Sequence, residues 1–121
     1  MIGVELQARR EFLGLTIEAL AGLLDVNPRT IRSWEAGRDP IPRRVPGEIA
    51  VIEAITTAAV GDLIAALADA DQPAVTVWRS DAAWRSSDHV ESGRFPARWW
   101  RHVAARARAG VPGTIIVVDG V

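Results

Sequence analysis

Between positions 27 and 44 the chain carries side chains that can hydrogen-bond to nucleic acid. Three of them suit the edges of bases: Arg29, Arg32 and Ser33. An arginine can donate two hydrogen bonds to O6 and N7 of guanine, and a hydroxyl can bond to several base edges. Five others suit phosphate oxygens, which accept bonds from arginine, hydroxyl and amide groups: Asn27, Thr30, Arg38, Arg43 and Arg44.

Residue groupings that are typical of catalysis or of metal binding are missing from the sequence. The chain has no cysteine, which excludes disulfides and thiolate metal ligands. His89 and His102 have no acid or second histidine beside them at metal-ligand spacing, and no Ser–His–Asp grouping or glycine-rich phosphate loop is present. We therefore expect no catalytic residues, no metal site and no cofactor, and we do not expect an enzyme.

Two short helices joined by a tight turn must position the base-edge candidates. Residues 16–37 read TIEALAGLLDVNPRTIRSWEAG, with apolar residues at helical spacing on both sides of a break. Thr16 and Asn27 are suitable N-cap residues for the two helices. Because Ile31 and Trp34 face inward, the three base-edge candidates face outward.

This stretch resembles the lambda-repressor/Cro-like helix-turn-helix family. That family has a small residue in its second helix, an apolar turn, a polar cap, Thr-Ile and then Trp-Glu-x-Gly. The matching residues are Ala21, Leu24, Val26, Asn27, Thr30, Ile31, Trp34, Glu35 and Gly37. Two positions depart from the pattern: Ile17 stands where the family usually has a phosphate-binding Gln, and Asp25 stands where it usually has Gly. Asp tolerates a left-handed backbone, so the turn is preserved.

The resemblance covers about the first half of the chain and implies that the second helix of the motif enters the major groove of double-stranded DNA. It also implies that the guanidinium of Arg10 pairs with the carboxylate of Glu35, in a geometry that suits a bidentate contact. The alternative for this pair is two solvated surface charges.

The arrangement of the whole chain resembles the small two-domain regulators that are associated with anti-CRISPR operons, and related uncharacterised bacterial proteins. The C-terminal half contributes an FP-x-x-WW-x-x-V-A segment at 95–104 to this resemblance. It implies a homodimeric autorepressor that binds an inverted repeat, and some relatives are thought to bind RNA. Two alternatives stay open: an antitoxin whose C-terminal half clasps a toxin, and an interaction protein that does not bind DNA.

A long helix is predicted from Val45 to about Ala70, after a proline-containing loop. Its alanine and isoleucine residues cover more than one face, which predicts burial on several faces. Glu53, Gly61 and Asp62 interrupt the apolar run, so we do not expect a membrane span and place the protein in the cytoplasm. The net charge of −1 requires any DNA-facing surface to be a local patch.

The pattern changes at positions 71–73, which we take as the boundary between a helix-turn-helix domain (1–70) and a small α/β dimerisation domain (74–121). Residues 74–78 and 114–118 are rich in strand formers. The second run is continuously apolar and predicts a buried strand. Two helices between the strands favour a parallel pair. The expected fold class is mainly α with a small β element.

Two strands alone make a poor sheet, and pairing with a second copy of the chain would hide its edges. We therefore expect a homodimer. The helix predicted from Pro96 to Ala109 carries an apolar set at Phe95, Trp99, Trp100, Val103 and Ala107, and arginines at 98, 101 and 108 along one side. These arginines are interpreted as a solvated face, with RNA contact as the alternative.

Overall fold

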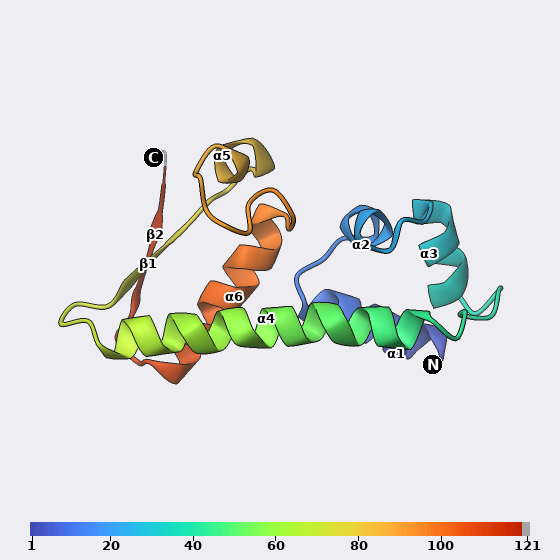
Figure 1. Ribbon diagram of the computed structural model, residues 1–121, viewed down its shortest axis with the longest axis horizontal. Helices are drawn as coiled ribbons and strands as arrows, with labels where there is room; N and C mark the ends of the chain where they lie inside the picture. Colours follow the sequence, from blue (N-terminus) through green and yellow to red (C-terminus); the bar gives the residue numbers. More distant parts are fainter. Residues whose placement is uncertain (120–121) are drawn as a thin grey trace. The chain divides into compact units, whose positions relative to one another are not determined.

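The computed structural model describes residues 1–119, which form six helices and two strands (Figure 1). The elements are α1 Gly3–Phe12, α2 Ile17–Leu24, α3 Pro28–Glu35, α4 Val45–Ala68, β1 Ala74–Val77, α5 Asp81–Arg85, α6 Ala97–Gly110 and β2 Ile115–Val118. The chain divides into two compact units, Met1–Ile55 and the residues from Thr56 onward. This division lies inside α4, whereas the sequence pattern changes only after that helix. The mainly helical class with a small β element is confirmed.

Local capping fixes the start of α2 and the turn that leads to α3. The hydroxyl of Thr16 accepts a hydrogen bond from the backbone N–H of Ala19 at 3.1 Å. The side-chain oxygen of Asn27 accepts one from the backbone N–H of Arg29 at 2.9 Å. Asp25 adopts the left-handed conformation with φ of 55°. The predicted helix starts and the tolerance of Asp at the turn are confirmed.

The core of the first unit is apolar and draws on all four of its helices. Its buried residues are Leu6, Leu13, Leu15, Leu20, Ala21, Leu24, Ile31, Trp34, Val45, Ile49 and Ile52. Along α1 and its end the buried stripe is Leu6, Arg10 and Leu13. The apolar pattern of this first helix also predicts burial of Val4 and Phe12, but they are 63% and 61% exposed. That expectation was wrong because each lies two positions from a stripe residue, about 200° around a helix.

The start of α1 lies unusually close to the end of α3. A Cβ atom at Gly3 would lie 2.4 Å from the carbonyl oxygen of Trp34 and 2.5 Å from that of Glu35. Both atoms belong to the backbone, so they have little freedom to move aside. The absence of a side chain at Gly3 therefore allows α1 to pack beside the helix that carries the base-edge candidates.

The helix α4 contributes its first half to one unit and its second half to the other. In the first unit, Val45 and Ile49 are fully buried, and Glu53 accepts hydrogen bonds from two nitrogens of Arg9, which joins α4 to α1. In the second unit, Thr56 is buried and accepts a hydrogen bond from Nε1 of Trp99 at 2.9 Å.

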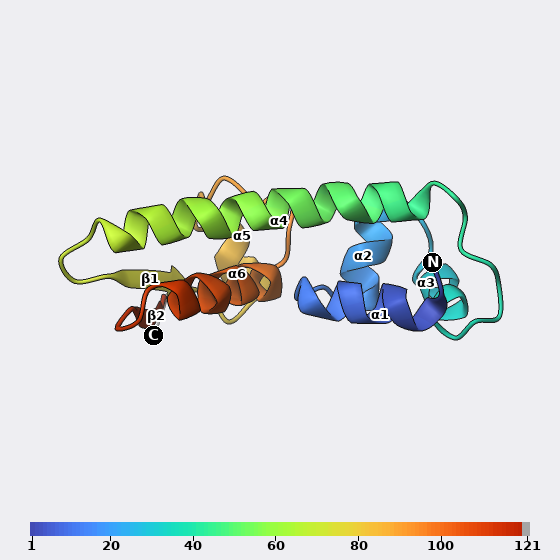
Figure 2. The same cartoon turned by 90° about the horizontal axis from the view of Figure 1, so that it is seen from below.

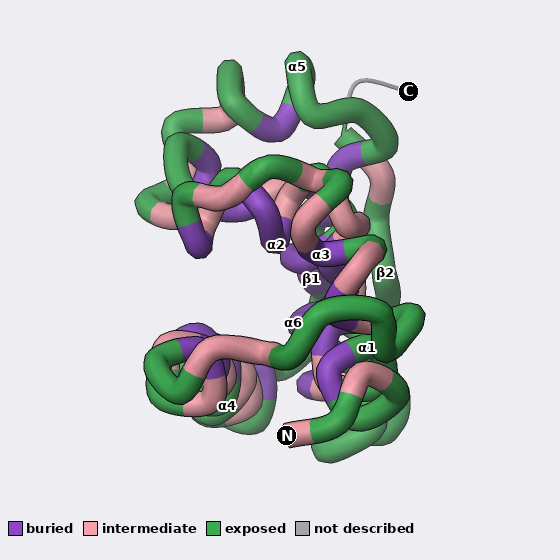
Figure 3. Tube along the Cα trace, turned by 90° about the vertical axis from the view of Figure 1, so that its right-hand side faces the viewer, coloured by how far each residue is buried: buried purple, intermediate pink, exposed green. Residues whose placement is uncertain are grey.

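The sequence predicted that α4 is buried on several faces, but the structure buries only part of the helix surface. Exposed and buried positions share the helix (Figure 3), and the exposed ones include Ala50, Val51, Ala54, Ala58 and Ala65. The helix has the length and the mean hydropathy, 24 residues and 1.8, of a membrane-spanning segment. Length and hydropathy alone do not distinguish a membrane span from a core helix of a soluble protein, and 22% of the apolar window of α4 is buried inside the structure.

In the second unit, β1 and β2 form a parallel pair with Ala74 opposite Ile115 and Val77 opposite Val118. Figures 1 and 2 show the two strands side by side, with α6 beside them. The parallel pairing is confirmed, but the prediction that the second strand is buried was wrong. Its residues Ile115, Ile116 and Val117 are 63%, 41% and 44% exposed. An apolar run shows that a strand can be buried, but whether it is depends on which other element covers it.

Tryptophans form the centre of the second unit. The ring of Trp84 lies 5.1 Å from that of Trp78 and 5.8 Å from that of Trp100, measured between centroids. The imidazole of His89 contacts two of these rings, with centroids 4.8 Å from Trp84 and 4.4 Å from Trp100. Burial lowers the pKa of His89, against a smaller opposing effect of the nearby Glu91 carboxylate. The histidine is thus part of the aromatic packing.

Candidate nucleic-acid interface

The helix α3 separates a buried face from a polar one. Ile31 is fully buried and Trp34 is 5% exposed, so both belong to the core. Arg29 and Arg32 are exposed, and Ser33 is partly exposed. The predicted division into inward and outward residues is therefore confirmed, and the three base-edge candidates lie together on one short helix.

Two of the three base-edge candidates have carboxylate partners. Nη2 of Arg32 lies 2.7 Å from Oε1 of Glu18, and the hydroxyl of Ser33 donates to Oδ2 of Asp39 at 2.6 Å. Arg29 has no side-chain partner within residues 1–119. The outward face of α3 therefore presents one unpaired arginine and one that is already held by an acid.

The phosphate candidates lie at the start of α3, within it and in the loop that follows. The side-chain oxygen of Asn27 is used to cap α3, and Thr30 is partly exposed. In the loop, Arg38 and Arg43 are exposed and have no side-chain partner in the part of the chain that the structure describes. Arg44 pairs with Glu48 one turn into α4, at 2.7 Å. Two arginines of the loop are therefore free to contact a negatively charged backbone.

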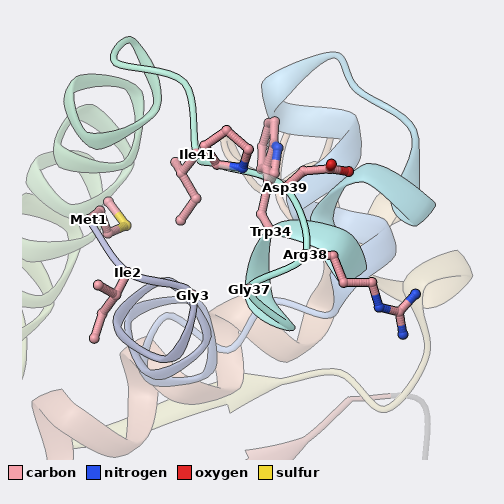
Figure 4. Close-up of a pocket in the computed structure, with 9 residues that line it drawn as sticks. Met1, Ile2, Gly3, Trp34, Gly37, Arg38, Asp39 and Ile41 are labelled. Atoms are coloured by element: carbon pink, nitrogen blue, oxygen red, sulfur yellow. The ribbon is translucent and has the colours of Figure 1, made fainter.

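A shallow hollow of about 390 Å³ lies where the start of α1, the end of α3 and the loop meet (Figure 4). It is lined by Met1, Ile2, Gly3, Trp34, Gly37, Arg38, Asp39, Pro40 and Ile41. Gly37 turns the chain out of α3 with φ of 77°. The side chain of Arg38 points away from the hollow (Figure 4), which leaves its guanidinium in solvent.

A buried ion pair anchors α1 to the end of α3. Nε and Nη2 of Arg10 donate to the two carboxylate oxygens of Glu35 at 2.7 and 2.9 Å, and Nη1 donates to the carbonyl oxygen of Leu15 at 3.0 Å. The side chains of the pair are only 11% and 8% exposed. The hydrogen bonds to Glu35 raise the pKa of Arg10, against the effect of burial. The bidentate pairing is confirmed, and the alternative of two solvated charges is wrong.

Comparison with known protein families supports this geometry. The model of a helix-turn-helix domain family matches residues 2–70, more than half of the chain. The chain belongs to this helix-turn-helix family. The match agrees with the lambda-repressor/Cro-like resemblance of residues 16–37. No curated protein matches the chain.

Outside the helix-turn-helix domain, two of the three arginines that were interpreted as a solvated face of α6 bind backbone carbonyls of the second unit, and Arg98 is exposed. Nη1 of Arg101 donates to the carbonyl oxygen of Trp78 at 2.7 Å, and Nε of Arg108 donates to that of Thr114 at 3.0 Å. The apolar set on this helix is buried as predicted. Buried tryptophans offer no stacking platform for bases, so the geometry does not favour RNA contact here.

Two carboxylates that contact the base-edge candidates, those of Glu18 and Asp39, were not predicted from the sequence. Glu18 contacts Arg32 across 14 positions, which no local spacing rule anticipates. Asp39 is six positions beyond Ser33, after a left-handed turn. An acid in the first turn of a helix is favourable by itself because of the helix dipole, so the position of Glu18 did not call for a partner.

Proposed function

We propose that this helix-turn-helix protein is a sequence-specific, DNA-binding transcriptional regulator that acts as a homodimeric repressor. The outward face of α3 carries the proposal, because it places Arg29, Arg32 and Ser33 together on a helix short enough to lie in the major groove. The free arginines of the loop that follows, Arg38 and Arg43, supply backbone contacts beside it.

In this mechanism α3 reads bases and the loop fixes its register. Each bidentate arginine–guanine contact contributes roughly 1–3 kcal/mol of discrimination against other bases. Asn27 and Thr30, at the start of α3, and Arg44, once released from Glu48, add contacts to phosphates. A regulator held on promoter DNA in this way excludes RNA polymerase and represses transcription from that promoter.

A twofold dimer would place two copies of α3 on successive turns of DNA, roughly 34 Å apart. The strand β2 supports self-association, because its apolar residues are exposed and its outer edge has no partner strand within residues 1–119. Such an edge pairs readily with another strand. Pairing of β2 with its counterpart in a second copy would give a four-stranded sheet and place Ile115 and Val117 beside the same residues of that copy, on one face of the sheet.

Arg32→Ala should weaken binding to the preferred duplex about 5- to 150-fold and relax the preference at one base pair. Arg43→Ala should instead weaken binding to all duplexes by a similar factor. It should also reduce the salt slope, which is the slope of log K against log salt concentration, by about one, the value for one phosphate contact. Fluorescence anisotropy titrations at several salt concentrations, on preferred and random duplexes, separate these results. Equal losses on both duplexes for Arg32→Ala would argue against a base-reading role.

Self-association should be visible at micromolar concentration by analytical ultracentrifugation. The double variant Ile115→Lys/Val117→Lys should sediment as a monomer, because both side chains lie on the outer face of β2 and would bring like charges together. Val90→Lys is the control, since Val90 is 87% exposed in a loop of the same unit and should leave the dimer intact. A wild-type protein that is only monomeric would contradict the dimer.

Footprinting on the DNA immediately upstream of the gene is the most direct test of the function as a whole. We expect a protected inverted repeat that overlaps the promoter. Absence of any protection, together with copurification of a second protein chain, would favour the antitoxin alternative over the repressor.

A further inference from the structure

The contact between Arg32 and Glu18 joins a base-edge candidate of α3 to the first turn of α2. Nη2 of Arg32 lies 2.7 Å from Oε1 of Glu18, and the two side chains are 55% and 62% exposed. An ion pair this exposed contributes little to folding. The position of the pair matters for binding, because any group that Arg32 contacts on a partner will come close to the Glu18 carboxylate.

The carboxylate leaves part of the guanidinium available. A guanidinium has five N–H donors, and the contact with Glu18 occupies only Nη2. That contact uses one of the two N–H groups of Nη2, and guanine needs two donors for O6 and N7, which the second N–H of Nη2 and a neighbouring guanidinium nitrogen can supply. Arg32 can therefore contact guanine while Glu18 continues to hold it, and the carboxylate limits the rotation of the side chain in the meantime.

A phosphate is a less favourable partner for an arginine held in this way. It carries a negative charge, so it would compete with the carboxylate for the same cation and be repelled by it at short range. The edge of a guanine has no net charge and meets no such repulsion. Arg29, which has no acidic partner in the described residues, lacks this bias.

We propose that Glu18 is a specificity-determining positioning residue: it orients Arg32 toward guanine and disfavours contact between Arg32 and phosphates. The inference rests on the proposed DNA-binding function and adds a role for an acid outside α3. A carboxylate at this place lowers affinity for DNA of any sequence and raises discrimination between sequences.

The test is selection of bound duplexes from a random-sequence library, with wild-type protein and Glu18→Gln, followed by affinities for the enriched and the random duplexes. In Glu18→Gln, affinity for random duplex should rise about 3- to 10-fold, and the preference for guanine at one position should weaken. The salt slope on random duplex should steepen by about 0.9, the value for one added phosphate contact.

Glu5→Gln is the matched control. Glu5 is also an exposed acid in the first turn of a helix, and it pairs with Arg9 at 2.9 Å. Glu5→Gln removes one negative charge, as Glu18→Gln does. Glu5 pairs with Arg9 and not with Arg32, so the substitution leaves the Arg32–Glu18 pair in place. It should leave both the enriched sequence and the ratio of the two affinities unchanged.

A second comparison tests whether Glu18 acts through Arg32. In an Arg32→Ala background, Glu18→Gln should change the ratio of affinities by less than 2-fold, because the two residues form one coupled pair. Unchanged melting temperatures would exclude a folding effect. If wild type and Glu18→Gln enrich the same sequence and show the same affinity ratio, the inference is overturned but the proposed function stands. If the wild-type protein enriches no sequence, the proposed function is overturned and the inference with it.

Discussion

Replacing Arg10 by alanine should lower the free energy of unfolding by about 3–5 kcal/mol, because it leaves the Glu35 carboxylate in the core without its partner. The side chain of Glu35 is 8% exposed and accepts two hydrogen bonds from Arg10. The carbonyl oxygen of Leu15 also loses a donor. Urea or thermal unfolding followed by circular dichroism measures the loss.

Arg9→Ala is the control on the neighbouring residue. Arg9 pairs with Glu5 and Glu53, but all three side chains are more exposed than those of the buried pair, at 28%, 48% and 35%. Water replaces such contacts at little cost, so the loss should be about 1 kcal/mol or less. Equal changes in melting temperature for the two variants would contradict the anchoring role of Arg10.

Trp84→Ala should destabilise the second unit by about 3–5 kcal/mol, the usual cost of emptying a buried tryptophan site. Trp84 is fully buried, and its ring packs against those of Trp78 and Trp100. Its Nε1 donates to the carbonyl oxygen of Phe95 at 2.6 Å, which ties α5 to the start of α6. Because β1 and β2 flank these helices in sequence, loss of self-association should accompany the loss of stability.

Trp84→Phe separates the ring from its hydrogen bond. The smaller ring retains most of the aromatic packing but leaves the carbonyl oxygen of Phe95 without its donor, at a cost of about 1–3 kcal/mol. Near-ultraviolet circular dichroism reports this unit well, since four of the five tryptophans belong to it. If Trp84→Ala unfolds at the same denaturant concentration as wild type, the aromatic cluster does not support this unit.

Several features of the helix-turn-helix domain could be read from the sequence because they depend on near neighbours. The caps Thr16 and Asn27 act on N–H groups two or three residues away, and Asp25 turns the chain by its own backbone preference. The inward position of Ile31 and Trp34 follows from the period of the helix. The partners Arg10 and Glu35 are distant in sequence, and only the family pattern brought them together.

Other features were decided by tertiary structure, because they depend on which surfaces meet. The sequence could not show that the apolar β2 remains uncovered on its outer side, since burial requires a neighbouring element as well as an apolar strand. Nor could it show that Glu18 meets Arg32, because the angle between α2 and α3 sets the distance between those side chains. The residue types thus determined a DNA-binding motif, and the packing of its helices determined which of its arginines is held by an acid.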